Sequence, residues 1–416
     1  MYLHMLDPHR LQRTLEDYEC LGLDVAADHL SSPSFEELAE LGIVGKTPML
    51  FGPDALPDAL VNDWLCSLSQ PMGGSAATRR TYAYAIRQFL EFCHAMPLSL
   101  AQVRYETVVN YWRCRRLMLG DSQIQARTWN VHAAAICSLF EFAVQRGLAM
   151  GFRLPEVSDR ALQHFNREAK NPLKERAGRA APKWITIDTY VDKVRPAALE
   201  GRFGTRDVCF LDLLVSTGFR LNEGASQQVY EWPDPANYPS ERKVVPYQLW
   251  RGCKGGRPRE VLTPLHRRVV ANVQSFIDGD RAELCHQAAR RNSNYIEPPE
   301  IWIGADGQAL AASSLGRIAR DAFARAGIEG SAHTLRHTFS VYQLQNSARR
   351  FIRAAVSSKN EEAFRQAMYD PLRRLQKLLG HRWLETTMIY LDALPDIDTL
   401  TEDSLDDWAS VLEILQ

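Results

Sequence analysis

The sequence feature that most constrains the fold is a set of cationic and imidazole side chains that ends in one tyrosine. Its members are Arg220, Lys254, His333, Arg336, His381 and Tyr390. Two dense motifs contain most of the set: a His-x-x-Arg-His run at 333–337, and a run at 378–390 that holds a Gly-His pair and ends at the tyrosine. If the set forms one site, a single domain has to bring these distant segments together.

The chemistry that this set favours is transfer of a phosphoryl group. A phosphate under attack becomes pentacoordinate, and the charge on its non-bridging oxygens is stabilised best by fixed donors that need no reorganisation. Arginine suits this task because its planar guanidinium binds two oxygens at once and stays protonated. A tyrosine in the same site supplies a nucleophile whose covalent phosphoester conserves the energy of the broken bond. The pattern therefore predicts a phosphodiester site that needs no ATP.

These residues and spacings resemble the tyrosine recombinase, or phage integrase, family. The family signature is an Arg in a Gly-x-Arg-x-x-Glu box, then His-x-x-Arg-His, then Gly-His, then Tyr. Here the first box runs from Gly218 to Glu223, and nine positions separate His381 from Tyr390, which matches the family spacing. The family lysine lies in a β-hairpin turn. Lys254 matches it, because glycines mark a turn there between apolar flanks.

The resemblance implies a role for the nucleophile and the three cations. Tyr390 is expected to attack the scissile phosphate and to form a 3′-phosphotyrosyl intermediate beside a free 5′-hydroxyl. Arg220 and Arg336 are expected to bind the non-bridging oxygens. Lys254 is expected to protonate the departing 5′-oxygen, because an ammonium on a flexible stem follows the leaving group.

Four further side chains are expected to assist. His333 is expected to help remove the tyrosine proton and to hold the phosphate, and His381 to donate a hydrogen bond to it. Glu223 is expected to orient an arginine, and His337 to act as a buttress. A zinc site built on His333 and His337 is disfavoured, because the glutamate of His-Glu-x-x-His is absent and Arg336 adds a fixed positive charge. No metal or other cofactor is expected.

The formal net charge of −1 hides a segregation of charge along the chain. Residues 1–60 hold 3 basic and 11 acidic side chains, and residues 391–416 hold 8 acidic ones and no Lys or Arg. The remainder, 61–390, carries a net charge of +15. A cationic body of this kind neutralises phosphates and releases counterions. The expected partner is therefore double-stranded DNA with a specific recombination site.

The eight cysteines are widely spaced and form no Cys-x-x-Cys pair, which predicts reduced thiols rather than a zinc ribbon or a disulfide framework. No apolar stretch is long enough to span a bilayer, and the first residues lack the pattern of a secretion signal. We therefore expect no membrane partner and a cytoplasmic, nucleoid-associated location.

Periodicity predicts a mainly α fold with a small antiparallel sheet, an α+β class. Helices are expected over 57–150, and short strands near 228–232, 247–251 and 259–263. The resemblance implies a helical core-binding domain followed by a tyrosine-recombinase catalytic domain. The expected divisions are an acidic segment of unknown role at 1–55, the SAM-like core-binding domain at 56–151, a basic linker at 152–183, the catalytic domain at 184–395, and a tail helix at 396–416 that docks on a neighbouring protomer.

Five polar side chains lie off the apolar stripes of the predicted core-binding helices. They are expected to meet phosphates or base edges, although a solvated helix face explains each of them equally well: Arg79, Arg80, Arg87, Arg127 and Asn130. Two segments, near 281–300 and 346–371, lengthen the chain relative to the family pattern. The register of the flanking motifs survives both insertions, so the site is expected to remain complete.

The resemblance implies a site-specific DNA recombinase or integrase that cuts and rejoins strands through a Holliday junction as a homo-tetramer on DNA. The inserts and the acidic N-terminal segment favour a role in a mobile element, by integration or transposition, with accessory proteins as further candidate partners. Two alternatives stay open. One is a type IB topoisomerase, which shares the chemistry but relaxes DNA as a monomer, and the other is a non-catalytic DNA-binding regulator on the same fold.

Overall fold

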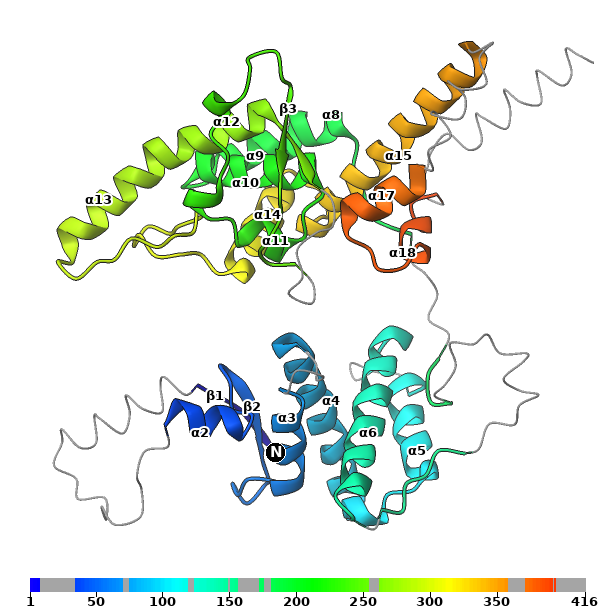
Figure 1. Ribbon diagram of the computed structural model, residues 1–416. Coiled ribbons are helices and arrows are strands. Elements are labelled where there is room, and N and C mark those ends of the chain that lie inside the picture. The colour runs from blue at the N-terminus through cyan, green and yellow to red at the C-terminus, as the bar shows by residue number, and fades with distance from the viewer. Residues whose placement is uncertain are drawn as a thin grey trace, which may run out of the picture. The chain divides into compact units, whose positions relative to one another are not determined.

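The computed structural model describes residues 1–7, 34–69, 75–118, 123–148, 150–155, 172–175, 181–253, 262–357 (backbone only at 348–357), 371–391 and 393. The chain divides into two compact units, Met1–Gly178 and Arg179–Gln416. Each unit has a hydrophobic core of its own, and Figure 1 shows the helices that make up each one. None of the described helices combines the length and the apolar character that a membrane span requires.

The first unit is a helical bundle joined by a two-stranded sheet. Its elements are β1 (Tyr2–Leu6), α2 (Phe35–Glu40), β2 (Thr47–Phe51), α3 (Ala59–Ser67), α4 (Ala76–Ala95), the 3-10 turn η1 (Leu100–Gln102), α5 (Tyr105–Arg116) and α6 (Ala126–Gln145). The two strands pair antiparallel, with Tyr2 opposite Phe51. The side chain of Asn62 fastens β2 to α3, because it bonds both the backbone N–H of Leu50 at 2.7 Å and its carbonyl at 3.0 Å.

The apolar stripes of α4 and α6 form the core of this unit. Ser75 caps α4 by accepting a hydrogen bond from the backbone N–H of Thr78 at 3.2 Å, and the predicted stripe through Ile86, Phe89 and Cys93 is buried. Trp129 of α6 is fully buried and its indole N–H donates to the carbonyl of Leu173 at 2.6 Å. The part of the predicted linker at 172–175 therefore packs on this unit.

The second unit is built mainly from helices around α10. Its elements are α8 (Ile187–Thr189), the π-helical turn η2 (Tyr190–Val194), α9 (Arg195–Leu199), α10 (Gly204–Thr217), α11 (Leu221–Ala225), the 3-10 turns η3 (Val229–Glu231) and η4 (Pro235–Asn237), β3 (Val244–Tyr247), β4 (Thr263–His266), α12 (Arg267–Phe276), the π-helical turn η5 (Ile277–Arg281), α13 (Ala282–Arg291), α14 (Ala312–Arg325), α15 (Ala332–Ser357), α17 (Pro371–Leu379) and α18 (Glu385–Met388).

The strand positions of this unit differ from the predicted ones. The segment predicted as a strand at 228–232 contains the 3-10 turn η3 at Val229–Glu231, and in the described part of the chain its strand-like pairing is the isolated bridge between Gln228 and Glu300. The two strands of the hairpin lie at 244–247 and 263–266. Both lie a few residues farther from the turn than the strands predicted at 247–251 and 259–263. The predicted class, mainly α with small antiparallel sheets, is confirmed.

The predicted insertion near 281–300 consists of α13 and a returning loop that is fastened to the unit. Arg281 is 2% exposed, and its guanidinium donates to the carbonyl of Pro298 at 2.6 Å and to that of Glu300 at 3.1 Å. The loop then leads to Trp302, a fully buried residue whose indole N–H donates to the carbonyl of Gly224 at 2.8 Å. This contact ties the insertion to α11, which begins directly after Arg220.

A second, smaller apolar cluster of this unit fixes the C-terminal motif. Side chains of α15, of α17 and of the segment after α18 form it: Phe339, Val341, Leu344, Leu375, Leu379 and Tyr390. The tyrosine is thus a buried member of a packed cluster.

Candidate active site

The end of α10 and the start of α11 position Arg220. Gly218 ends α10 in a left-handed conformation with φ of 65°, a conformation that glycine adopts without strain. Arg220 then caps α11, and its backbone N–H donates to Glu223 Oε2 at 2.6 Å. The glutamate reaches back over one helical turn, so the Gly-x-Arg-x-x-Glu spacing is itself the geometry of a capping box.

Glu223 is a buried carboxylate that contacts both arginines. Its side chain is fully inaccessible to solvent and accepts from Arg220 Nη1 at 2.8 Å. The guanidinium of Arg336 lies on its other side, with Nη1 at 3.8 Å from Oε2. A buried charge requires compensating partners, and the two guanidiniums supply them. The carboxylate thereby holds two positive charges beside each other.

Arg336 comes from α15 and is itself only 2% exposed. It donates to the carbonyl of Gly218 at 2.5 Å and to that of Leu379 at 2.8 Å, and Arg220 Nη2 donates to the next carbonyl, that of Gly380, at 3.2 Å. These carbonyls lie at the ends of α10 and α17, which bear partial negative charge. The arginines therefore converge from two segments far apart in the sequence.

The turn after α17 sets the position of His381. Gly380 is left-handed, with φ of 60°, and the His381 backbone N–H returns to the carbonyl of Gln376 at 3.0 Å. The ring Nε2 lies 3.1 Å from Arg336 Nη2 and Nδ1 lies 3.0 Å from Thr387 Oγ1. Because a guanidinium only donates, Nε2 accepts from it, and the ring proton sits on Nδ1 and points at Thr387.

Tyr390 lies at the centre of this arrangement and is 1% exposed. Its hydroxyl is 2.9 Å from His337 Nδ1, and its ring lies parallel to that of His381 at 6.4 Å between centroids. Burial raises the pKa of Tyr390, and the Ser340 hydroxyl and the Arg336 and Arg220 guanidiniums oppose that shift. The phenol is therefore protonated at neutral pH and faces fixed positive charge.

His333 lies on the same face of α15 as His337, one turn earlier. Its ring meets that of His337 edge to face at 4.2 Å between centroids, and its side chain is exposed. Partial burial, followed by Arg336 and Arg220, lowers the pKa of His333. Among the described residues no hydrogen bond joins His333 to the tyrosine.

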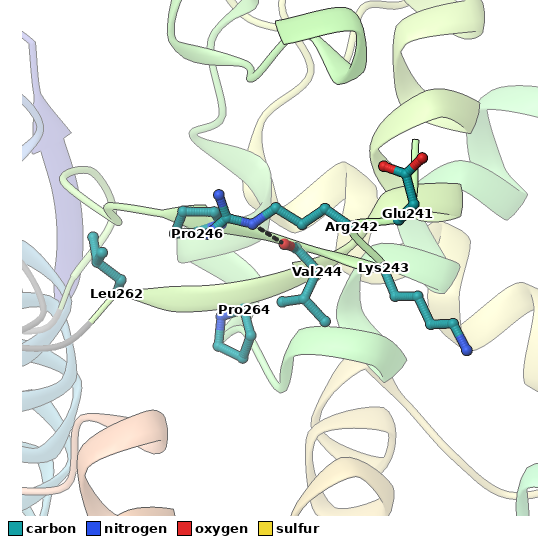
Figure 2. Close-up of a pocket in the computed structure, with 7 residues that line it drawn as sticks. All are labelled: Glu241, Arg242, Lys243, Val244, Pro246, Leu262 and Pro264. Atoms are coloured by element: carbon teal, nitrogen blue, oxygen red, sulfur yellow. Dashed lines mark hydrogen bonds between the residues drawn. The ribbon is translucent and has the colours of Figure 1, made fainter. Parts of the chain in front are cut away.

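Lys254 lies outside the described residues, so its predicted place in the site stays a prediction. Its loop starts beside α11: a Cβ added to Gly252, whose φ is 67°, would lie 2.3 Å from the carbonyl of Asn222. Figure 2 shows a hollow on the β3–β4 hairpin, where Arg242 lies along the strand and donates to the carbonyl of Val244 at 3.1 Å. This hollow includes none of the predicted site residues, so the tyrosine cluster is the better candidate site.

Five of the six predicted catalytic residues lie in one cluster of the second unit, and the sixth, Lys254, lies outside the described residues. The predicted DNA-binding residues of the first unit differ in their exposure to solvent. Arg80 and Arg127 are exposed, and Arg87 is half-buried and lies 3.5 Å from Glu91. Arg79 is 5% exposed, and the amide of Asn130 binds both the backbone N–H and the carbonyl of Glu175 at 2.8 and 2.9 Å. The contacts of Asn130 and the burial of Arg79 fit a structural role.

Sequence reasoning missed several groups in the cluster. Ser340 and Thr387, and the carbonyls of Gly218, Leu379 and Gly380, all contact a predicted site residue. A weak signal existed for Ser340, which lies one helical turn after Arg336. Within the described residues no group of three or more His, Cys, Asp or Glu side chains could hold a metal ion.

Comparison with known proteins supports the fold and the family. The family model "Phage integrase, N-terminal SAM-like domain" matches residues 61–147. The chain is similar to the tyrosine recombinase XerD of Mycobacterium leprae, with 28% identity over 51% of this chain and 57% of the relative. It is also similar to the tyrosine recombinase XerA of Pyrococcus furiosus, with 23% identity over 76% of this chain and 84% of the relative. The chain thus spans little more than half the length of the XerD proteins that it matches.

Two solved structures share the fold. The XerH site-specific recombinase bound to a palindromic difH substrate, in a post-cleavage complex, superposes with a TM-score of 0.55 at 17% identity over 97% of this chain and 95% of that one. A lambda integrase dimer bound to a COC′ core site superposes with a TM-score of 0.50 at 13% identity over 80% and 94%. The chain is therefore similar to tyrosine recombinases in both sequence and fold.

Proposed function

We propose that this protein is a site-specific DNA recombinase that cleaves and rejoins strands through a 3′-phosphotyrosyl intermediate. The observation that carries the proposal is the position of the Tyr390 hydroxyl, which is hydrogen-bonded within a cluster that also holds Arg336 and Arg220. A nucleophile beside two fixed guanidiniums suits attack on a phosphodiester. The similarity to XerD and XerA recombinases supports the same reading.

Each side chain has a defined part in the proposed reaction. The Tyr390 oxygen bonds to phosphorus and the bond to the 5′-oxygen breaks. Arg220 and Arg336 exchange the carbonyls of Gly218, Leu379 and Gly380 for the non-bridging oxygens. Lys254 delivers a proton to the departing 5′-oxygen, which leaves a free 5′-hydroxyl. The reverse reaction, with a 5′-hydroxyl from a second duplex, completes strand exchange.

The biological setting belongs to the same proposal. A homo-tetramer on two duplexes exchanges strands through a Holliday junction, and the long chain with its acidic N-terminal segment suits a mobile element. The tail at 396–416, proposed to dock on a neighbouring protomer, lies outside the described residues. The reaction takes place in the cytoplasm, where DNA is the partner.

Trapping of the covalent intermediate tests the proposal. The substrate is a nicked duplex that carries the DNA flanking the protein's own gene, since a nick lets the short 5′-product diffuse away. The wild-type protein is expected to form an adduct that resists sodium dodecyl sulfate, and Tyr390→Phe to form none while binding the duplex with unchanged affinity. An adduct with Tyr390→Phe refutes the assignment of the nucleophile. Relaxation of a supercoiled plasmid that lacks the flanking DNA identifies a topoisomerase instead.

A further inference from the structure

Among the described residues, three polar side chains interact with the phenolic oxygen of Tyr390. His337 Nδ1 lies at 2.9 Å, and the Ser340 hydroxyl and the Arg336 guanidinium also interact with it. Only one of the three is a base. The guanidinium stays protonated, and a neutral serine hydroxyl is too weak a base to hold a second proton.

His337 is available as a proton acceptor at neutral pH. The groups that face it are His333 and Arg336 on its own helix and Tyr390 from the segment after α18. Burial, followed by the charges of His333 and Arg336, lowers the pKa of His337 to about 4. The ring is therefore neutral, and one of its nitrogens carries a lone pair. In the tautomer that carries its proton on Nε2, Nδ1 accepts from the Tyr390 hydroxyl at 2.9 Å.

His333, which the family resemblance makes the expected acceptor, is placed differently. Its side chain is exposed, and the ring of His337, at 4.2 Å between centroids, is the ring that it contacts. The 2.9 Å contact to the tyrosine belongs to His337 instead. An exposed imidazole beside two arginines is better placed to contact an incoming phosphate than to deprotonate a buried phenol.

We propose, on the basis of the recombinase function proposed above, that His337 holds the Tyr390 hydroxyl and takes its proton during strand cleavage. The O–H bond of Tyr390 breaks and an Nδ1–H bond forms on His337, while the phenolic oxygen bonds to phosphorus and the bond to the 5′-oxygen breaks. The proton on the 5′-oxygen comes from Lys254. One proton leaves the nucleophile and one reaches the leaving group, so the step is balanced. In the reverse reaction His337 returns its proton to the tyrosine.

The resting hydrogen bond is tested in the full-length, DNA-free protein by ¹⁵N NMR with labelled histidine. His337→Gln identifies the two ring resonances by their loss. We expect Nδ1 without a proton and Nε2 protonated at pH 7, and we expect Tyr390→Phe to shift the Nδ1 resonance. A proton on Nδ1, with the phenol turned to Ser340, overturns the proposal whatever the enzyme does with DNA.

The proton transfer is tested by the single-turnover rate of adduct formation on the nicked duplex described above. The wild-type rate is expected to be flat between pH 6.5 and 8.5, since His337 is already neutral there. His337→Gln is expected to react about 100-fold more slowly at pH 7. Its rate should rise about tenfold per pH unit, because the phenol must then ionise without a base. His333→Gln is the matched control, expected to lower the rate but to keep the flat profile.

Three results contradict the proposed step. The first is a His337→Gln profile that is slow but flat, which indicates a structural role, and the second is a wild-type rate in that variant. The third is a pH-dependent profile in His333→Gln alone. His337→Asn, with thermal unfolding to verify its fold, provides a second variant. If wild-type protein forms no adduct at all, the recombinase function fails and the proton transfer fails with it, whereas the NMR result on the hydroxyl contact stands separately.

Discussion

Glu223 is the buried carboxylate on which both guanidiniums of the site depend. Glu223→Ala leaves two cations without their shared counter-charge, so we expect it to destabilise the protein by about 3 to 5 kcal/mol in urea unfolding. Glu329→Ala is the control, because Glu329 forms its ion pair with Lys183 in solvent at 2.7 Å and 85% side-chain exposure. A surface pair contributes about 1 kcal/mol or less. Equal effects of the two substitutions contradict the role assigned to Glu223.

His132 makes the first unit sensitive to acid. The ring is 5% exposed and its Nδ1 lies 2.9 Å from the Tyr111 hydroxyl. Burial, followed by Arg115, lowers its pKa to about 4. Because the folded pKa lies below that of the unfolded chain, the unfolded chain binds more protons at intermediate pH. The stability contributed by neutral His132 is complete above about pH 6.5 and is lost as the pH falls towards 4.

We expect unfolding of the first unit to require about 2 kcal/mol less at pH 5 than at pH 7 through this residue. Urea titrations of the wild type and of His132→Gln at both pH values measure it. The variant is less stable at pH 7 but should lose less on acidification. His94→Gln, at an exposed position of α4, should keep the full wild-type loss. An undiminished loss in His132→Gln contradicts the assignment.

The sequence predicted only those members of the site whose chemistry depends on the type of side chain. Arg220, Arg336, His381 and Tyr390 converge as their spacing suggested. The carbonyls of Leu379 and Gly380 carry no side-chain signature, so no pattern points to them as partners of the arginines. Which histidine meets the phenol depends on the rotation of α15, and spacing along a helix does not fix that.

The turn that ends α10 provides a test of how helix ends shape the site. A Cβ added to Gly218, whose φ is 65°, would lie 2.3 Å from the ring of Phe339, and the Gly218 carbonyl accepts from Arg336. Gly218→Ala therefore combines left-handed strain with a clash, and we expect a loss of about 2 to 4 kcal/mol in unfolding free energy. Cleavage activity should also fall, because the carbonyl that positions Arg336 moves.

Gly327 is the matched control for this substitution. It follows α14 with φ of 69°, and an added Cβ meets nothing within 4 Å. Gly327→Ala therefore carries the backbone strain alone, about 1 to 2 kcal/mol, and should keep cleavage activity. If both variants lose the same stability, the contact between Gly218 and Phe339 does not contribute.

Helices with strong apolar periodicity were predictable and the short strands were not. The buried face of α4 could be predicted because a helix that buries one face needs apolar side chains at steps of three and four residues. The segment 228–232 has strand-like composition but forms a 3-10 turn, since its partner near Glu300 pairs at one bridge only. A four-residue strand depends on its cross-strand neighbours more than on its own residues.

Charge is distributed unevenly along the chain. Residues 61–390 carry a net charge of +15, and the segments on both sides of them are acidic. Exposed cations of the first unit are expected to neutralise phosphates, and release of counterions makes such binding fall with salt. The burial pattern separates the predicted contacts into two groups. Arg80 and Arg127 are open to solvent, whereas Arg79 is buried, and no described residue forms a hydrogen bond with its Nε or Nη1.

Binding of a mixed-sequence duplex at several salt concentrations tests this division. Arg80→Ala and Arg127→Ala should each reduce the slope of log affinity against log salt by about 1, because each removes one phosphate contact. Arg79→Met should leave the slope unchanged. It should also keep or raise stability, since an apolar side chain of similar length replaces a buried charge. The opposite result is a reduced slope in Arg79→Met with unchanged slopes in Arg80→Ala and Arg127→Ala. It means that Arg79 becomes exposed and contacts a phosphate when DNA binds, and that Arg80 and Arg127 do not contact the DNA.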